Sequence, residues 1–163
     1  MITGKFPALR LRRSRKNDWS RRLIEENNLT PNDFILPLFI IEGKNKKQSI
    51  NSMPNVYRYT LDKISPVVEK AIKIGLPMVA LFPYTNKINK DPLGSESLNE
   101  DNLVCKALQL IKKKYKNEIG IMCDVALDPY TSHGHDGLLS KGKILNDETV
   151  NILIKQSLLQ AEL

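Results

Sequence analysis

The sequence has few cysteines, few aromatic residues and no long apolar run. Two cysteines, Cys105 and Cys123, cannot build the disulfide framework that holds small secreted domains together, so a reducing cytoplasm is the expected compartment. No apolar run approaches the ~20 residues that span a bilayer, and the basic N-terminal residues are not followed by the apolar segment of a secretory signal. These absences favour a globular, cytoplasmic protein without membrane contacts.

Excess positive charge is missing from most of the chain and is concentrated at its beginning. Residues 1–24 carry eight basic residues and one acid, Asp18, whereas the remaining residues balance. We therefore expect residues 1–30 to form a basic arm that binds nucleic acid, an anionic surface or an acidic patch on another subunit. A short helix is predicted from Trp19 to Asn27, with Asp18 as its N-cap and Trp19 and Leu23 on its buried side.

From residue 31 onward, apolar runs of strand length alternate with helical patterns. Each run is apolar on both faces, as in a buried parallel sheet, and the alternation favours right-handed βαβ units. Residues 31–163 are therefore predicted to be an α/β domain with three β/α units. The predicted strands are 34–41, 77–83 and 119–125; the predicted helices begin at the caps Ser65, Asn99 and Asn146, with Pro66 first in the first helix and Gly75 just after it. The last helix is predicted to face inward with Val150, Leu153, Ile154, Ser157, Leu158 and Ala161.

The third strand is followed by a loop that is rich in acidic and imidazole side chains. Asp124 lies at the end of the strand, and Asp128 and Asp136 follow in the loop, where carboxylates can bind a hard cation or act as general acid and base. The two loop carboxylates can equally be ordinary turn residues, whereas Asp124 on a buried strand is expected to need a partner. His133 and His135 form a H-x-H pair, which can ligate zinc.

The same stretch carries a family resemblance that extends through the chain. Asp124-Val-Ala-Leu-Asp128-Pro-Tyr-Thr-Ser132-His133-Gly-His-Asp136-Gly, with the earlier Phe34-Ile-Leu-Pro-Leu-Phe and Ala80-Leu-Phe-Pro, resembles the porphobilinogen synthase (5-aminolevulinate dehydratase) family. The resemblance implies the N-terminal half of a (β/α)8 TIM barrel with an extended N-terminal arm that wraps a neighbouring subunit, commonly in an octamer. It also implies the condensation of two 5-aminolevulinate molecules, with loss of water, to porphobilinogen for haem and other tetrapyrroles.

The resemblance assigns roles to particular residues. It makes Asp124 catalytic and places Asp128, Ser132, His133 and Asp136 in the substrate pocket or its lid. The zinc-dependent members have three cysteines where this chain has Ala126, Asp128 and Asp136, which excludes cysteine-ligated zinc and implies the aspartate-bearing class, often stimulated by magnesium. Asp128 and Asp136 are then candidate metal ligands, although the main magnesium ligands are expected beyond Leu163.

The resemblance also implies that the catalytic lysines of the family are missing from these residues. The two lysines that form Schiff bases with the substrates are expected beyond Leu163, so the chain is expected to be an inactive N-terminal fragment of the enzyme. Two alternatives stay open. One is a metal-dependent hydrolase with His133, His135 and Asp136 as ligands. The other is a non-enzymatic binding module led by the basic arm, which has only Phe6 and Trp19 for stacking on nucleic acid bases.

Overall fold

The structure, a computed structural model, describes residues 4–163. The chain divides into two units, Met1–Thr30 and Pro31–Leu163, and the first three residues of the expected arm lie outside the described residues. Within the described part of the chain, no helix is long and apolar enough to cross a membrane. The second unit contains the sheet and the loops that follow its strands, so it is the unit that positions the candidate site.

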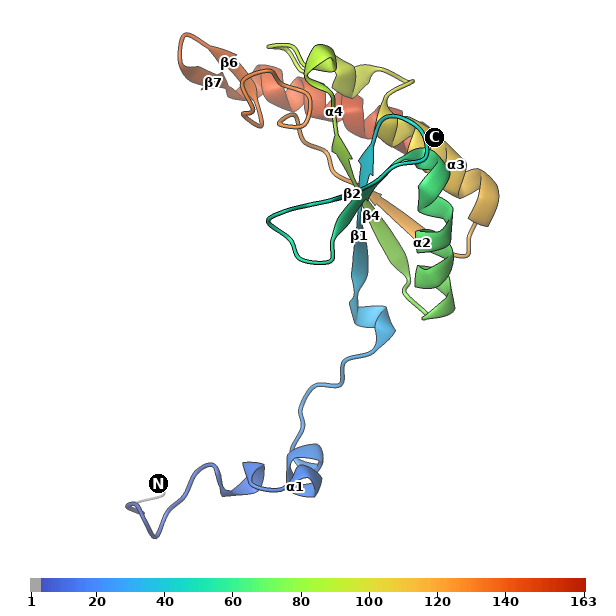
Figure 1. The fold of residues 1–163 in the computed structure, drawn as a ribbon. Coiled ribbons are helices and arrows are strands. Elements are labelled where there is room, and N and C mark those ends of the chain that lie inside the picture. The colour runs from blue at the N-terminus through green and yellow to red at the C-terminus, as the bar shows by residue number, and fades with distance from the viewer. Residues whose placement is uncertain (1–3) are drawn as a thin grey trace. The chain divides into compact units, whose positions relative to one another are not determined.

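The second unit is built on one five-stranded sheet with the order β2-β3-β1-β4-β5 (Figure 1). The three predicted strands are confirmed and lie side by side in parallel, β1 with β4 and β4 with β5. A hairpin of β2 and β3 is added beside β1, where β3 runs parallel to it. The sheet strands are β1 (Ile35–Ile41), β2 (Lys47–Ser49), β3 (Tyr57–Tyr59), β4 (Met78–Tyr84) and β5 (Gly120–Cys123).

Pro37 lies in the middle of β1, a position that the sequence makes awkward because proline donates no hydrogen bond to a sheet. It is aligned with Ala80 of β4 on one side. On the other side, β3 reaches only Phe39 and Ile40. On that side the backbone at Pro37 has no partner among the described strands. The missing N–H of the proline therefore costs the sheet no hydrogen bond there.

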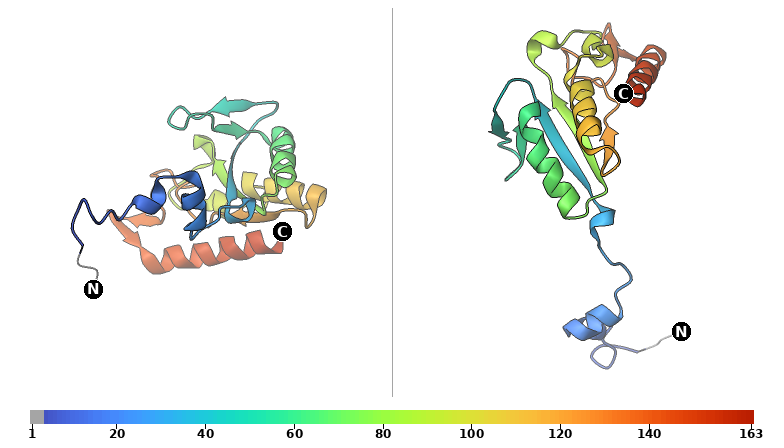
Figure 2. Two further views of the ribbon diagram at one scale, coloured as in Figure 1. Left: turned by 90° about the horizontal axis from the view of Figure 1, so that it is seen from below. Right: turned by 90° about the vertical axis from the view of Figure 1, so that its right-hand side faces the viewer.

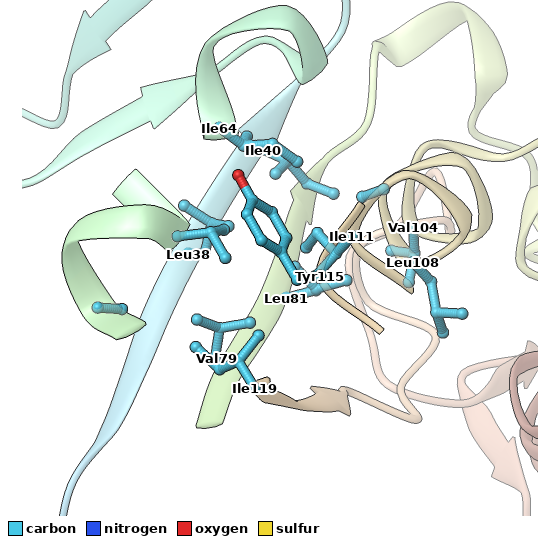
Figure 3. Packing of buried hydrophobic residues seen from close by; sticks show 13 residues of the cluster. Leu38, Ile40, Ile64, Val79, Leu81, Val104, Leu108, Ile111, Tyr115 and Ile119 are labelled. Carbon is cyan, nitrogen blue, oxygen red and sulfur yellow. The ribbon is translucent and has the colours of Figure 1, made fainter. Parts of the chain in front are cut away.

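Two helices cover one face of the sheet. Leu38 and Ile40 of β1 and Val79 and Leu81 of β4 point toward these helices and form the centre of the core (Figure 3). A long helix follows the β6–β7 hairpin and ends near the C-terminus (Figure 2). The bounds are α2 (Leu61–Lys73), α3 (Leu103–Tyr115), β6 (Leu138–Ser140), β7 (Lys143–Leu145) and α4 (Asn146–Glu162), with 3-10 turns at Pro31–Asp33, Lys87–Asn89 and Ser95–Leu98.

The opposite face of the same sheet is largely apolar and uncovered. Because side chains alternate along a strand, Ile35 and Phe39 of β1, Phe82 of β4 and Met122 of β5 point away from the helices. Ile35 and Met122 are each 43% exposed, and within Pro31–Leu163 the helices that contact β1 and β4 lie on the other face. An apolar sheet face of this kind is normally covered by further structure.

The predicted starts of α2 and α3 are wrong. α2 begins at Leu61 after the N-cap Thr60, not at Ser65, so Pro66 lies inside the helix. Its first turn is retained because Ile64 is fully buried and Leu61 packs on the core, which outweighs the local preference of Pro66 for the first helical position. α3 is capped by Asn102, whose side chain accepts the Cys105 N–H at 2.9 Å, and not by Asn99. The predicted C′ residue Gly75, with φ of 79°, is confirmed.

The side of α4 that packs against the protein is not the side that the sequence predicts. The apolar residues Val150, Ile154 and Leu158 are 45–57% exposed. The buried side instead carries Thr149, Gln156 and Gln160. The helix begins at Asn146 with Leu145 as its N-cap, and no side chain caps it. A hydrophobic stripe on the outside of a helix therefore replaces the inward-facing stripe that the sequence pattern predicts.

The N-terminal unit has one short helix, α1 (Asp18–Leu23), and a 3-10 turn at Arg13–Arg15. The helix is shorter than predicted, and Asn17, not Asp18, is its N-cap. Asp18 instead forms ion pairs with Arg21 and Arg22 at 3.4 and 3.1 Å. The expected burial of Trp19 and Leu23 is also wrong, since they are 62% and 78% exposed; six helical residues alone supply no core to receive them.

Candidate active site

The candidate site lies where β1, β4 and β5 end, because the loops after these parallel strands emerge at one edge of the sheet. Glu42 follows β1, residues 85–102 connect β4 to α3, and residues 124–137 connect β5 to the β6–β7 hairpin. This edge carries the acidic residues that the sequence singled out. It also carries polar residues from the two other loops, which the sequence did not single out.

Asp124 is the first residue after β5, which ends at Cys123 and not at residue 125 as predicted. Its side chain is exposed, so the expectation that it is buried and needs a partner is wrong. Within residues 4–163 the Asp124 carboxylate makes no hydrogen bond and no ion pair. It is thus a free, exposed carboxylate directly after the parallel strand β5, at one edge of the described sheet.

Asp128 and Asp136 occupy different environments in the loop after β5. One carboxylate oxygen of Asp136 accepts the backbone N–H of Leu127 at 2.6 Å and so ties the two ends of the loop together. Burial, with the negative charges of Asp136 and Asp124, raises the pKa of Asp128 above its ordinary value. Lys90, from the loop after β4, donates to the backbone carbonyl of Asp128 at 3.2 Å and opposes this rise.

The shift at Asp128 predicts a dependence of stability on pH. Because its pKa is higher in the folded protein than in the unfolded chain, ionising Asp128 costs free energy in the folded state only, and wild-type stability falls as the pH rises through this range. Asp128→Asn removes that cost. We expect urea denaturation to show the variant gaining stability relative to wild type as the pH rises from about 3 to about 6.

A matched control for this prediction is Asp147→Asn, since Asp147 is an exposed aspartate in the first turn of α4. The stability of this variant relative to wild type over the same pH range gives the baseline for removing an exposed aspartate, against which the gain of Asp128→Asn is measured. If Asp128→Asn behaves as this control does, the carboxylate of Asp128 is not destabilised in the folded protein.

The H-x-H pair is organised by hydrogen bonds and does not form a metal site in the described chain. His133 Nε2 lies 3.2 Å from the Pro92 carbonyl oxygen, and its Nδ1 accepts the backbone N–H of His135 at 3.2 Å. Because a carbonyl only accepts, Nε2 carries the proton, and both nitrogens of His133 are engaged. Among the residues described, no three His, Cys, Asp or Glu side chains form a group that could hold a metal ion. The hydrolase alternative therefore gains no support.

The loops after β4 and β5 are docked against each other, a feature that sequence reasoning missed. The N–H of Asp91 donates to the Tyr130 carbonyl at 3.3 Å, and the N–H of Ser132 donates to the Asp91 carbonyl at 2.9 Å. The Asp91 carboxylate accepts the N–H groups of Leu93 and Ser95, and these bonds lower its pKa. Ser132, an expected pocket residue, is thus placed by its backbone, while its side chain is exposed.

Two further contacts position the same region from other elements. Glu42 accepts hydrogen bonds from the side-chain amides of Asn86 and Asn89, which joins the end of β1 to the loop after β4. From α4, the fully buried Gln156 donates to the Ala126 carbonyl at 3.3 Å and supports the segment between Asp124 and Asp128. Polar residues whose partners are backbone groups carry no distinctive spacing, so the sequence does not mark them.

The cysteines take no part in this arrangement. Cys105 is buried on α3, and Cys123 is half-buried at the end of β5, where burial raises the pKa of its thiol to about 11. Both thiols are therefore protonated at neutral pH and are poor metal ligands. At Ala126, Asp128 and Asp136 the chain offers two carboxylates and no thiol.

Comparison with known proteins identifies the family. The family model for delta-aminolevulinic acid dehydratase matches residues 8–163. Enzymes named delta-aminolevulinic acid dehydratase from Bradyrhizobium diazoefficiens and Chlamydia pneumoniae are 54% and 41% identical to this chain over 95% and 94% of its length. These matches cover 44% and 46% of the relatives, so the chain spans less than half the length of the curated relatives it matches.

A solved structure gives the same answer for the fold. The delta-aminolevulinic acid dehydratase (porphobilinogen synthase) of Toxoplasma gondii, in complex with the reaction product porphobilinogen, superposes with a TM-score of 0.86 at 36% identity. The similarity covers 94% of this chain and 44% of that chain. The family match and the α/β fold agree, and this chain belongs to the delta-aminolevulinic acid dehydratase family.

Proposed function

We propose that these residues form the N-terminal half of a porphobilinogen synthase, a lyase that condenses two 5-aminolevulinate molecules to porphobilinogen with loss of water. The observation that carries the proposal is the match of residues 8–163 to the family. The three parallel strands and their helices are then the first β/α units of a barrel, and the uncovered apolar sheet face is its interior. Residues 31–163 are proposed to be this barrel portion and residues 1–30 its arm.

In this proposal the described residues bind and orient substrate, and the Schiff-base lysines come from outside them. Asp124 is the candidate catalytic group, since its carboxylate is free and lies at a strand end. Asp128, Ser132, His133 and Asp136 form the substrate-facing loop. The docking of this loop on residues 90–92 holds it in shape. A group held in place before substrate arrives loses little entropy in the reaction, which favours catalysis.

The metal assignment remains part of the proposal. We propose an oxygen-ligated magnesium ion with its main ligands outside these residues, because the loop has carboxylates where thiolate ligation would need cysteines. Asp128 and Asp136 alone do not supply a coordination shell for it: Asp136 is committed to the Leu127 N–H, and the described residues contain no three-ligand group. No step is assigned to the ion here.

The arm is proposed to pack on a second copy of the protein, in a cytoplasmic homo-oligomer such as an octamer. Its large apolar side chains are exposed, with Phe6 at 77%, Leu11 at 83% and Leu23 at 78%. Apolar and basic side chains together suit a protein surface better than nucleic acid, where stacking aromatic residues are usual.

The proposed function predicts that catalysis needs both halves of the barrel. We expect the 163-residue chain alone to make no porphobilinogen from 5-aminolevulinate. We expect activity when it is co-expressed with the portion of the Bradyrhizobium diazoefficiens relative that lies beyond its match to this chain. Neither half is expected to be active alone, and product is measured colorimetrically in purified mixtures. Product from the isolated chain, or none from the pair once they copurify, would contradict the proposal.

A further inference from the structure

The helix α2 has another helix on one side and a groove on the other. On the first side, Lys114 of α3 donates to the Glu69 carboxylate at 2.9 Å, and the Tyr115 hydroxyl donates to the Ser65 carbonyl at 3.1 Å. On the second side, a groove of about 590 Å³ lies between α2, β1 and the β2–β3 hairpin (Figure 2). This is about the volume of one helical turn with its side chains.

The groove combines apolar and basic residues. The apolar side chains that line it include Leu36 of β1 and Val67 of α2, which are half-buried and pack on the core. The lysines that line it, Lys47 of β2 and Lys63 and Lys70 of α2, are exposed. Apolar contacts at the centre and polar groups at the rim are the usual composition of a protein–protein interface.

The two α2 lysines of this rim are free. Lys63 and Lys70 are seven residues apart, so they lie on one flank of the helix, two turns from each other. Among residues 4–163, their ammonium groups make no hydrogen bond and no ion pair. The opposite flank carries Glu69, which is paired with Lys114. α2 therefore presents an acid to the helix that follows it and two unpaired cations on its other side.

The groove is on the side where a barrel requires a further helix. The helices of a (β/α)8 barrel form an outer ring, so each of them has a helix on both sides. α3 is one neighbour of α2, and no helix other than α2 contributes to the lining of the groove. In the proposed barrel, the second neighbour of α2 is the last helix of the ring, which belongs to the complementary half.

We propose that the groove beside α2 is the docking surface for the last helix of the complementary half, and that Lys63 and Lys70 select a helix with an acidic flank. The inference rests on the proposed function. The basic arm of another copy does not suit the same rim, because residues 1–24 carry eight basic residues and one acid and like charges repel. Charges at the rim of an interface steer the correct partner and reject others.

The double variant Lys63→Glu/Lys70→Glu tests this rim in the pair formed with the remaining portion of the Bradyrhizobium diazoefficiens relative. We expect the Kd between the two halves to rise roughly 10- to 100-fold, because two attractive contacts become repulsive. Serial dilution of the copurified pair, followed by gel filtration, measures this Kd. Added salt is expected to weaken the wild-type pair and to narrow the difference between the two, since it screens exposed charges.

The matched control is Lys73→Glu/Lys113→Glu, which makes the same change in net charge. Lys73 on α2 and Lys113 on α3 are both exposed, and neither lines the groove. This control is expected to keep Kd within about threefold of wild type. The neutral variant Lys63→Met/Lys70→Met adds no repulsion and is expected to have an intermediate Kd. Urea denaturation of each isolated chain shows whether the variant is folded.

Cross-linking identifies the partner without any substitution. A carbodiimide joins an amine directly to a carboxylate that contacts it, so only residues that are already paired are linked. In the wild-type pair we expect amide bonds from Lys63 or Lys70 to aspartate or glutamate in the last helix of the complementary half. Mass spectrometry of the digested pair locates them.

The outcomes separate this inference from the function on which it rests. If the wild-type pair makes no porphobilinogen, the proposed function fails, and the inference fails with it. If the pair is active but a folded Lys63→Glu/Lys70→Glu or Lys63→Met/Lys70→Met variant keeps the wild-type Kd, the inference alone is overturned. It is equally overturned if the control weakens the pair as much, or if the two lysines are linked to the arm of another copy.

Discussion

Leu81→Ala is expected to destabilise the Pro31–Leu163 unit by about 3–5 kcal/mol, the upper part of the range for a leucine removed from a packed core. Leu81 is fully buried and lies on β4, which has a strand on each side. Its side chain packs between the sheet and the helices in the same cluster as Leu38, Val79 and Ile111, where little can move to fill the space. Urea denaturation followed by circular dichroism measures the loss.

The matched control is Leu158→Ala on α4, which removes the same atoms from a side chain that is 57% exposed. This variant is expected to stay within about 0.5 kcal/mol of wild type. A similar loss in both variants would mean that Leu158 is covered in solution, and no loss in Leu81→Ala would mean that the sheet and helices are not packed as described. Since domains are stable by only about 5–15 kcal/mol, Leu81→Ala is also expected to lower the yield of folded protein.

Asp124→Asn is expected to lower kcat/KM of the active pair by 10²- to 10⁴-fold, the usual contribution of a positioned carboxylate in proton transfer or charge stabilisation. The substitution keeps the shape of the side chain and removes its charge. The carboxylate is exposed and has no partner in the described chain, so its loss leaves no buried group unpaired. Initial rates of porphobilinogen formation measure the effect, with unchanged denaturation midpoints showing that folding is intact.

Asp147→Asn is the control for this experiment as well, because Asp147 is an exposed aspartate on α4 and lies outside the loops of the site. It is expected to retain wild-type kcat/KM. A decrease of less than about threefold in Asp124→Asn would remove Asp124 from the catalytic group and would leave the loop carboxylates as candidates.

The three parallel strands β1, β4 and β5 were predictable from the sequence because buried parallel strands are apolar without interruption, and such runs are rare elsewhere in the chain. The three-residue strands of the β2–β3 and β6–β7 hairpins carry no such run, and the sequence did not predict them. The residues at which the helices begin were harder to predict. Pro66 is a strong local signal for a first turn, yet burial of Ile64 extends α2 by one turn in the other direction. Tertiary packing overrides local preference in such cases, and it is not visible in a single sequence.

The buried side of α4 was predicted wrongly for a related reason. Hydrophobic periodicity assigns Val150, Ile154 and Leu158 to the inside, whereas Gln156 faces inward because its amide binds the Ala126 carbonyl. A second buried glutamine, Gln160, accompanies it. Hydrophobic periodicity shows that a helix has an apolar face and a polar face, but it does not show which face packs against the protein and which faces solvent.

The candidate site was predictable in composition but not in arrangement. The run from Asp124 to Asp136 stands out because it concentrates acidic and imidazole side chains after a strand. The contacts that shape it, such as those of Asp91 with Tyr130 and Ser132, are made by backbone groups of a distant loop. Backbone groups are the same in every residue, so only the folded structure shows which of them meet.

The two edge strands of the sheet differ in polarity, and this difference determines the edge at which another strand can add. At one border β2 presents Lys47, Gln48 and Ser49, all exposed and polar, and a charged border of this kind discourages further strands from adding to it. At the other border β5 presents Ile121, Met122 and Cys123, without a charge, and pairs only with β4 among the described strands. In the proposed barrel, further strands therefore add at β5, and the parallel contacts of β1 with β4 and of β4 with β5 join consecutive β/α units. A sheet with one receptive border and local contacts can assemble in the order of synthesis, unit by unit, which avoids the slow closure of distant pairings.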